Sequence, residues 1–268
     1  MSWVNGVHET LLPISDRAVQ FGDGCFTTAK VLNGRVDYLA DHLTRLQQNS
    51  QQLFLPECDW KQLESEMQAA AEGCELGVLK VMLTRGQGGR GYSALGCSGP
   101  TRIMSLSAYP QHYLQWQQQG VRLTLSPVQL SRNPLLAGLK HLNRLEQVMI
   151  RQALEQTDAD EALVADTAGM LVECCAANIF WREGHRVFTP DLSYSGVAGI
   201  MRQRLINLLN ASDNFNLEIV SEPVTRLASA DEVIICNALM PILPVKQAGN
   251  WRYNASELYD FCQQALNK

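Results

Sequence analysis

The hydrophobic and polar positions of the first hundred residues predict a small sheet with two helices. Residues 26–32 alternate in the manner of a strand, and Asn33-Gly34 favours a type I′ hairpin turn into a second strand over 35–38. Leucines near helical spacing then predict a helix from Leu39 to the stop at Pro56. The other elements predicted here are a helix over 60–71, strands over 78–83 and 103–108, and a glycine-rich loop over 85–99 between these strands.

A second domain is predicted after a polar segment. Tyr109-Pro110 and the glutamines that follow indicate a linker, so we expect an N-terminal domain over 1–112, a linker over 113–119 and a C-terminal domain over 120–268. Strands dominate the middle of the chain without strict alternation with helices, which favours an α+β fold over a doubly wound sheet. The elements predicted here are strands over 121–128, 162–166, 218–220 and 233–236, and helices over 141–155, 200–209 and 256–266.

Composition and charge restrict the classes of partner. The 268 residues are 46% hydrophobic with a net charge of −5, so no basic field attracts nucleic acid or an anionic membrane surface. No secretion signal and no apolar run of roughly 18 residues occur, and we therefore expect a cytoplasmic protein. The eight cysteines are expected to be reduced thiols, and the scattered histidines predict no metal site.

The glycine-rich loop contains a motif that is typical of dinucleotide binding. Residues 86–91 match G-x-G-x-x-G after a predicted strand. A dinucleotide site needs a helix next, whereas Gly96, Gly99 and Pro100 follow here, and no acidic residue occurs between Gly91 and Tyr113. We therefore predict a substrate loop rather than a dinucleotide site.

Two charged residues in apolar surroundings are candidates for catalysis. Lys140 follows the apolar residues 135–139, and desolvation favours the neutral amine that a Schiff-base nucleophile needs. The alternative is a surface lysine at a helix start. Glu173 lies between apolar and small uncharged residues and needs a partner. That partner is either a protonated ring nitrogen or a cross-strand arginine, Arg182 or Arg186.

Two backbone segments are candidates for anion binding. Gly199-Ile200-Met201 opens a predicted helix, whose first N–H groups can bind an anion without any side chain. Asn237-Ala238 follows a buried strand and could supply further N–H groups. The alternatives are an ordinary helix cap and an ordinary loop.

Three separated blocks resemble the signature of a known family. The blocks are residues 173–180 (Glu173 to Phe180), 187–189 and 197–202, and their order and spacing are similar to those of the class IV aminotransferases, the fold-type IV pyridoxal-phosphate enzymes. The likeness extends to residues 16–24, 42–46 and 139–143. It implies an α+β fold with a smaller N-terminal α/β domain, a larger C-terminal mixed β domain with helices, and pyridoxal 5'-phosphate as the cofactor.

The resemblance also implies roles for single residues. Lys140 would be the Schiff-base lysine and proton shuttle, Arg45 would bind the phosphate, and Glu173 would pair with the pyridine nitrogen. The further residues that it implies for cofactor binding are Asn178, Ile200, Met201, Asn237 and Ala238.

Departures from the usual family pattern bear on the reaction. Thr27 stands where aminotransferases of the family usually carry glutamate, and Asn237 where they tend to have Gly, Ser or Thr. These departures, with residues 132–155 and loop residues 88–92, are similar to members that convert 4-amino-4-deoxychorismate to 4-aminobenzoate and pyruvate in folate biosynthesis. The alternatives are a branched-chain or D-amino-acid aminotransferase and a non-catalytic pyridoxal-phosphate or anion-binding protein.

The two carboxylates of that substrate require cations. Arg90 of the glycine-rich loop is the first candidate, and its alternative is a solvated loop arginine. Tyr92, Tyr109 and Thr27 complete the expected substrate-binding set. The family further implies a homodimer in which the Arg90 loop lies near the partner's site.

Overall fold

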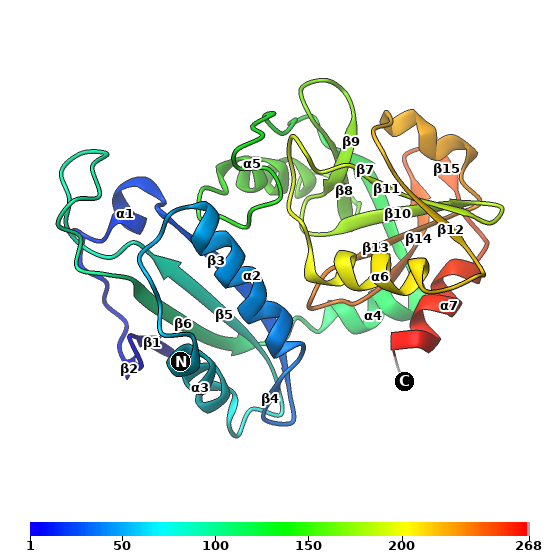
Figure 1. The fold of residues 1–268 in the computed structure, drawn as a ribbon. Coiled ribbons are helices and arrows are strands. Elements are labelled where there is room, and N and C mark those ends of the chain that lie inside the picture. The colour runs from blue at the N-terminus through cyan, green and yellow to red at the C-terminus, as the bar shows by residue number, and fades with distance from the viewer. Residues whose placement is uncertain (267–268) are drawn as a thin grey trace. The chain divides into compact units, whose positions relative to one another are not determined.

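The computed structural model describes residues 1–266 and divides into two compact units (Figure 1). Unit 1 consists of residues 1–110 and the short segment 140–143, and unit 2 consists of 111–139 and the chain from Arg144 onward. Each unit combines helices with one β-sheet, so the predicted α+β class is confirmed.

Unit 1 is a six-stranded antiparallel sheet in the order β2-β1-β6-β5-β3-β4. Leucines of α2 and α3, among them Leu46 and Leu63, pack with Leu79 and Val81 of the sheet in one apolar core. The strands are β1 (Ser2–Val4), β2 (Val7–His8), β3 (Gly24–Leu32), β4 (Arg35–Val36), β5 (Leu76–Thr84) and β6 (Thr101–Ala108), and the helices are α1 (Arg17–Phe21), α2 (Leu39–Gln52) and α3 (Trp60–Ala71).

The predicted hairpin between β3 and β4 is confirmed. Asn33 and Gly34 have φ angles of 50° and 75°, as a type I′ turn requires at both central positions. Leu32 and Arg35 are paired across the turn.

Unit 2 is built on a nine-stranded mixed sheet. Its order is β12-β11-β10-β13-β14-β7-β8-β9, and β15 pairs with β14. The core includes Ile179, Trp181, Phe188 and Ile235. The strands are β7 (Val121–Leu125), β8 (Glu161–Ala165), β9 (Leu171–Cys174), β10 (Asn178–Glu183), β11 (Arg186–Pro190), β12 (Asn216–Val220), β13 (Glu232–Cys236), β14 (Leu243–Ala248) and β15 (Trp251–Arg252). The helices are α4 (His112–Gln119), α5 (Leu145–Leu154), α6 (Ile200–Asn210), the 3-10 helix η1 (Val224–Ser229) and α7 (Glu257–Leu266).

Two predicted segments differ from the structure. Residues 113–119, which we expected to be a linker, lie in α4, because glutamine favours a helix and because Tyr113 and Trp116 pack against the core of unit 2. The helix expected over 141–155 begins only at Leu145. The residues before it pair with β3 instead, where the N–H of Leu142 donates to the carbonyl of Gly24 at 2.9 Å.

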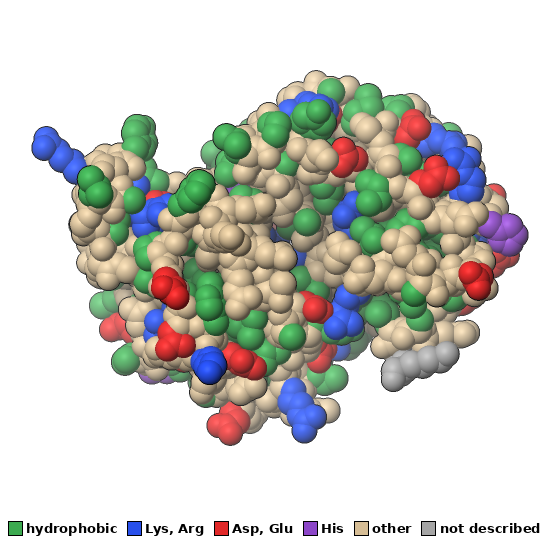
Figure 2. All heavy atoms as spheres, in the orientation of Figure 1, with side chains coloured by type: hydrophobic (Ala, Val, Ile, Leu, Met, Phe, Trp, Pro, Cys, Tyr) green, Lys and Arg blue, Asp and Glu red, His purple; other side chains and the backbone are tan. Residues whose placement is uncertain are grey.

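The surface carries both signs of charge. On the face drawn in Figure 2, basic and acidic side chains are interspersed. Among residues 1–266, no helix is both long enough and apolar enough to cross a membrane. Those residues also contain no group of three or more His, Cys, Asp or Glu side chains placed to hold a metal ion.

Candidate active site

Glu173 is a buried carboxylate on β9, with 5% of its surface exposed. Its Oε2 accepts the N–H of Val197 at 2.8 Å. The two arginines considered as alternative partners are engaged with other acids: Arg182 pairs with Glu232 at 3.1 Å, and Arg186 pairs with a glutamate of β12 at 2.8 Å. Both arginines that the sequence offered as partners of Glu173 are thus paired with other glutamates, and the role of Glu173 stays a prediction.

A half-buried arginine, Arg144, and a buried one, Arg202, interact electrostatically with Glu173. Burial lowers the pKa of Arg144 and of Arg202, and the negative charge of Glu173 opposes this lowering in both. Nearby positive charges in turn favour the ionised form of a carboxyl group.

Asn178 and Glu173 together fix the segment that enters α6. The side-chain Nδ2 of Asn178 donates to the carbonyl of Val197 at 2.9 Å, while the N–H of Val197 goes to Glu173. A Cβ at Gly199 would lie 2.0 Å from Oδ1 of Asn178, so the close approach requires glycine. Asn178 thus positions this segment, and direct contact with a cofactor stays a prediction.

The N-terminus of α6 has the features of an anion site. Gly199 offers no side-chain cap, and the first turn of α6 contains no acidic residue. Ile200 and Met201 are the first two residues of that turn, and Arg202 follows them. The buried Nε of Arg202 has no hydrogen-bond partner within residues 1–266. Helix N–H groups beside a buried cation suit a phosphate group.

Asn237 uses its side chain to fix two loops. Its Nδ2 donates to the carbonyl of Ala176, in the turn between β9 and β10, at 2.9 Å. Its Oδ1 accepts the N–H groups of Leu239 and Met240, each at 2.8 Å. Asn237 and the neighbouring Ala238 are half-buried. Contacts of either residue with a cofactor remain predictions.

Unit 1 brings Lys140, Thr27 and His42 into one neighbourhood. The carbonyl of Lys140 accepts the N–H of Phe26 on β3 at 2.9 Å, and Nζ lies 4.6 Å from the centroid of the Phe26 ring. Thr27 follows Phe26 on β3, and its Oγ1 lies 2.5 Å from Nδ1 of His42. Thr27 has no exposed surface, so its predicted contact with substrate stays a prediction.

His42 and Arg45 lie three residues apart on α2 and therefore share a face of the helix. Burial, with the charges of Arg45 and Lys140, lowers the pKa of His42 to about 3, so this imidazole is neutral at physiological pH. Burial lowers the pKa of Arg45 only to about 10, and its guanidinium stays charged. A buried guanidinium is a strong phosphate ligand, so this part of unit 1 fits an aldehyde cofactor that carries phosphate.

The predicted substrate residues of unit 1 differ in exposure. Arg90 and Tyr92 lie on the glycine-rich loop, and the Tyr92 side chain is 91% exposed. The element that follows this loop is the strand β6. Tyr109 is buried, with its ring centroid 5.8 Å from Nζ of Lys30.

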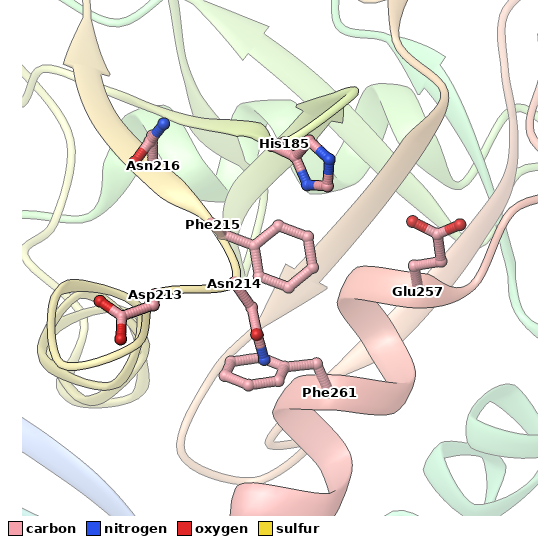
Figure 3. A pocket seen from close by; sticks show the side chains of 7 residues that line it. All are labelled: His185, Asp213, Asn214, Phe215, Asn216, Glu257 and Phe261. Carbon is pink, nitrogen blue, oxygen red and sulfur yellow. The ribbon is translucent and has the colours of Figure 1, made fainter.

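Unit 2 also contains an open cavity of about 600 Å³ (Figure 3). Its lining includes Phe215 and Phe261, which meet edge to face, and the side chains of His185, Asp213 and Glu257. None of the residues predicted for cofactor or substrate binding lines this cavity.

The sequence was compared with models of known protein families. The amino-transferase class IV model matches residues 24–248. The chain belongs to this family. The resemblance drawn from residues 173–180, 187–189 and 197–202 is therefore confirmed.

Individual relatives refine the comparison. The chain is 38% identical over 245 residues to the aminodeoxychorismate lyase of Vibrio harveyi, covering 91% of this chain and 90% of the relative. It is 26% identical over 243 residues to the D-alanine aminotransferase of Bacillus licheniformis, covering 88% and 83%. The crystal structure of 4-amino-4-deoxychorismate lyase from Pseudomonas aeruginosa superposes with a TM-score of 0.94 and 36% identity, covering 100% of this chain and 98% of the other. The expected fold-type IV architecture is confirmed.

Sequence reasoning missed two residues of the site, His42 and Arg202. Both lie inside segments that carry the family resemblance, 42–46 and 197–202. Their burial and their partners arise only in the folded chain, so the resemblance was the single signal that pointed to them.

Proposed function

We propose that the chain is a pyridoxal-phosphate-dependent lyase that converts 4-amino-4-deoxychorismate to 4-aminobenzoate and pyruvate. The observation that carries this choice is the identity to two lyases, 38% and 36%, which exceeds the 26% identity to the D-alanine aminotransferase. Thr27 and Asn237, which depart from the usual aminotransferase pattern, support the same choice.

The family resemblance assigns the cofactor contacts to Lys140, Arg45, Ile200, Met201 and Glu173. Nζ of Lys140 would bind its aldehyde covalently, and the guanidinium of Arg45 and the N–H groups of Ile200 and Met201 would bind its phosphate. Glu173 would keep a proton on the pyridine nitrogen. When bound, the protonated ring of pyridoxal phosphate accepts the electrons of a substrate carbon that has lost a proton.

Lys140 would also move the proton in the reaction. Its amine, released when the substrate amine takes its place, removes the proton from the ring carbon that carries the substrate nitrogen. The electron pair of that C–H bond forms a double bond to the neighbouring carbon, whose C–O bond to the enolpyruvyl group breaks. The substrate ring becomes aromatic, and the enolpyruvate takes up a proton and leaves as pyruvate. No second amino acceptor is consumed.

The substrate carboxylates would be bound by Arg90, with Tyr92 and Tyr109 as further contacts. We include in the proposal a homodimer in which the Arg90 loop serves the partner's site. Apolar side chains on the surface of unit 2 support an interface there, since Leu135 is 87% exposed and Leu145 is 71% exposed. A cytoplasmic location is also proposed, and the eight cysteines, all free thiols, support it.

The test uses the holoenzyme with 4-amino-4-deoxychorismate and no keto acid. We expect 4-aminobenzoate and pyruvate in equal amounts over many turnovers, with the cofactor recovered as the aldehyde. Lys140→Ala is the control and should lose both the turnover and the borohydride-reducible attachment of the cofactor. A single turnover that leaves pyridoxamine phosphate would instead identify an aminotransferase of branched-chain or D-amino acids.

A further inference from the structure

Arg17 is a buried arginine at the start of α1, and only 4% of its surface is exposed. Its Nε pairs with Oδ2 of Asp23 at 2.8 Å. The other end of the guanidinium faces the glycine-rich loop, where Nη1 donates to the carbonyls of Gly91 at 3.0 Å and Ser93 at 3.2 Å. Nη2 donates to the carbonyl of Tyr92 at 3.4 Å. One side chain thus binds three consecutive backbone carbonyls.

The base of the glycine-rich loop is closed by other contacts. The N–H of Arg17 donates to the carbonyl of Gly86 at 3.0 Å, and the N–H of Ser98 donates to the carbonyl of Gln87 at 2.8 Å. Oδ2 of Asp16 accepts the hydroxyl groups of Thr84 and Thr101, on the two strands that enter and leave the loop. None of these bonds involves residues 90–93, which form the tip of the loop. The contacts of the Arg17 side chain with the loop, by contrast, all lie at this tip.

The tip has little regular structure of its own. Gly88, Gly89 and Gly91 have positive φ angles of 107°, 75° and 57°, which glycine adopts at little energetic cost. Because glycine also has access to many other backbone conformations, ordering this segment costs conformational entropy. The N–H of Ser93 donates to the carbonyl of Arg90 at 3.1 Å, which closes one turn. A Cβ at Gly89 would lie 3.0 Å from Nη1 of Arg17, so the turn packs closely on the guanidinium.

Phe21 joins the same cluster through its ring. The guanidinium carbon of Arg17 lies 4.8 Å from the centroid of the Phe21 ring, and that ring lies 5.6 Å from the ring of Tyr92. Cation–π and aromatic contacts of this kind add to the hydrogen bonds. Backbone and side chain of the tip are therefore both held from α1.

We propose that Arg17 is a positioning residue that fixes loop residues 91–93 and thereby presents Arg90 to a substrate carboxylate. The inference rests on the proposed function of Arg90. A loop that is ordered before the substrate arrives does not lose its conformational entropy on binding. Loss of the Arg17 contacts should therefore weaken substrate binding and leave the chemical step nearly unchanged.

Arg85 provides a matched control within the same unit. Its Nε pairs with the same Oδ2 of Asp23, also at 2.8 Å. Its other nitrogens donate to the carbonyls of Leu53 and Phe54, which follow α2, and not to the loop tip. Arg85→Gln therefore removes a second arginine of the same ion-pair network without removing a contact to residues 91–93.

The first experiment measures trypsin cleavage after Arg90 in the holoenzyme. Releasing a loop tip from several hydrogen bonds should raise its cleavage rate by about tenfold or more in Arg17→Gln and in Arg17→Lys, since one ammonium cannot reach three carbonyls. Arg85→Gln should cleave at close to the wild-type rate. Cleavage after Arg102, inside β6, reports unfolding of the unit. If Arg17→Gln does not fold, Arg17→Lys decides the outcome.

The second experiment measures KM and kcat for 4-amino-4-deoxychorismate. In Arg17→Lys we expect KM to rise by about tenfold and kcat to change by less than about twofold. In an Arg90→Ala background the same change should raise KM by much less than tenfold, because Arg17 then acts on substrate binding through Tyr92 alone. Unchanged cleavage after Arg90 would overturn the positioning role of Arg17. Faster cleavage with unchanged KM would overturn the substrate role of Arg90 on which the inference rests.

Discussion

Replacing Glu161 by glutamine should make the stability of the protein less dependent on pH. Glu161 begins β8 and is 3% exposed. Burial raises the pKa of its carboxyl from 4.5 to about 7, against the opposing effects of backbone hydrogen bonds and of the Arg151 charge. The N–H groups of Ala162 and Ala176 donate to its two oxygens at 2.9 and 3.1 Å.

The size of the effect follows from the difference between the two pKa values. Below pH 4.5 the carboxyl is protonated in both the folded and the unfolded chain and contributes nothing. Between pH 4.5 and about 7 the unfolded chain releases the proton while the folded protein keeps it, so stability falls as pH rises. Above pH 7 the full penalty applies, and a shift of about 2.5 units corresponds to about 3 kcal/mol.

The assay is unfolding in urea at pH 5 and at pH 8, followed by tryptophan fluorescence. Glutamine resembles the protonated carboxyl and cannot ionise, so the free energy of unfolding of Glu161→Gln, relative to wild type, should rise by about 2.5 kcal/mol from pH 5 to pH 8. Glu155→Gln is the control, because it removes a carboxylate whose side chain is 48% exposed on a surface ion pair. If the free energy of unfolding of Glu161→Gln differs from that of wild type by the same amount at pH 5 and at pH 8, the reasoning is refuted.

Three further substitutions test the cofactor site. Glu173→Gln should keep the cofactor, seen by its absorbance, but lose most turnover, and near wild-type turnover would contradict the assignment. Arg45→Ala should weaken cofactor binding by about ten- to a hundredfold, because a charge-assisted hydrogen bond contributes about 1.5–3 kcal/mol. An unchanged dissociation constant in a fluorescence titration would show that Arg45 binds something else. Gly199→Ala places a Cβ 2.0 Å from Oδ1 of Asn178, so both the melting temperature and the cofactor affinity should fall. Wild-type values for both would exclude a phosphate-binding role for the N-terminus of α6.

Local signals predicted the parts of the fold that local chemistry determines. The type I′ turn at Asn33-Gly34 and the helix that begins at Leu39 depend on neighbouring residues and were predicted correctly. The hairpin of β1 and β2 was missed although Asn5-Gly6, with φ angles of 51° and 81°, carries the same turn signal, because strands of three and two residues show no alternation beside it. The glutamines of 113–119 looked like a linker because the apolar contacts of Tyr113 and Trp116 are tertiary.

The candidate site divides in the same way. Lys140 and Glu173 were found because each is a charged residue in an apolar stretch, which is visible in the sequence. The contact of Thr27 with His42 joins β3 to α2, and the contacts of Arg17 join α1 to residues 91–93. Neither contact can be predicted from a local sequence motif, because each joins segments that meet only in the folded unit 1.

The environment of Glu173 shows how backbone groups orient a buried carboxylate. The N–H of Val197 is a neutral donor that orients Oε2 without cancelling its charge. The turn that follows Glu173 is held at Ala176, whose N–H donates to Glu161 and whose carbonyl accepts from Asn237. Backbone contacts thus help to set the position of Glu173 and of the turn that follows it.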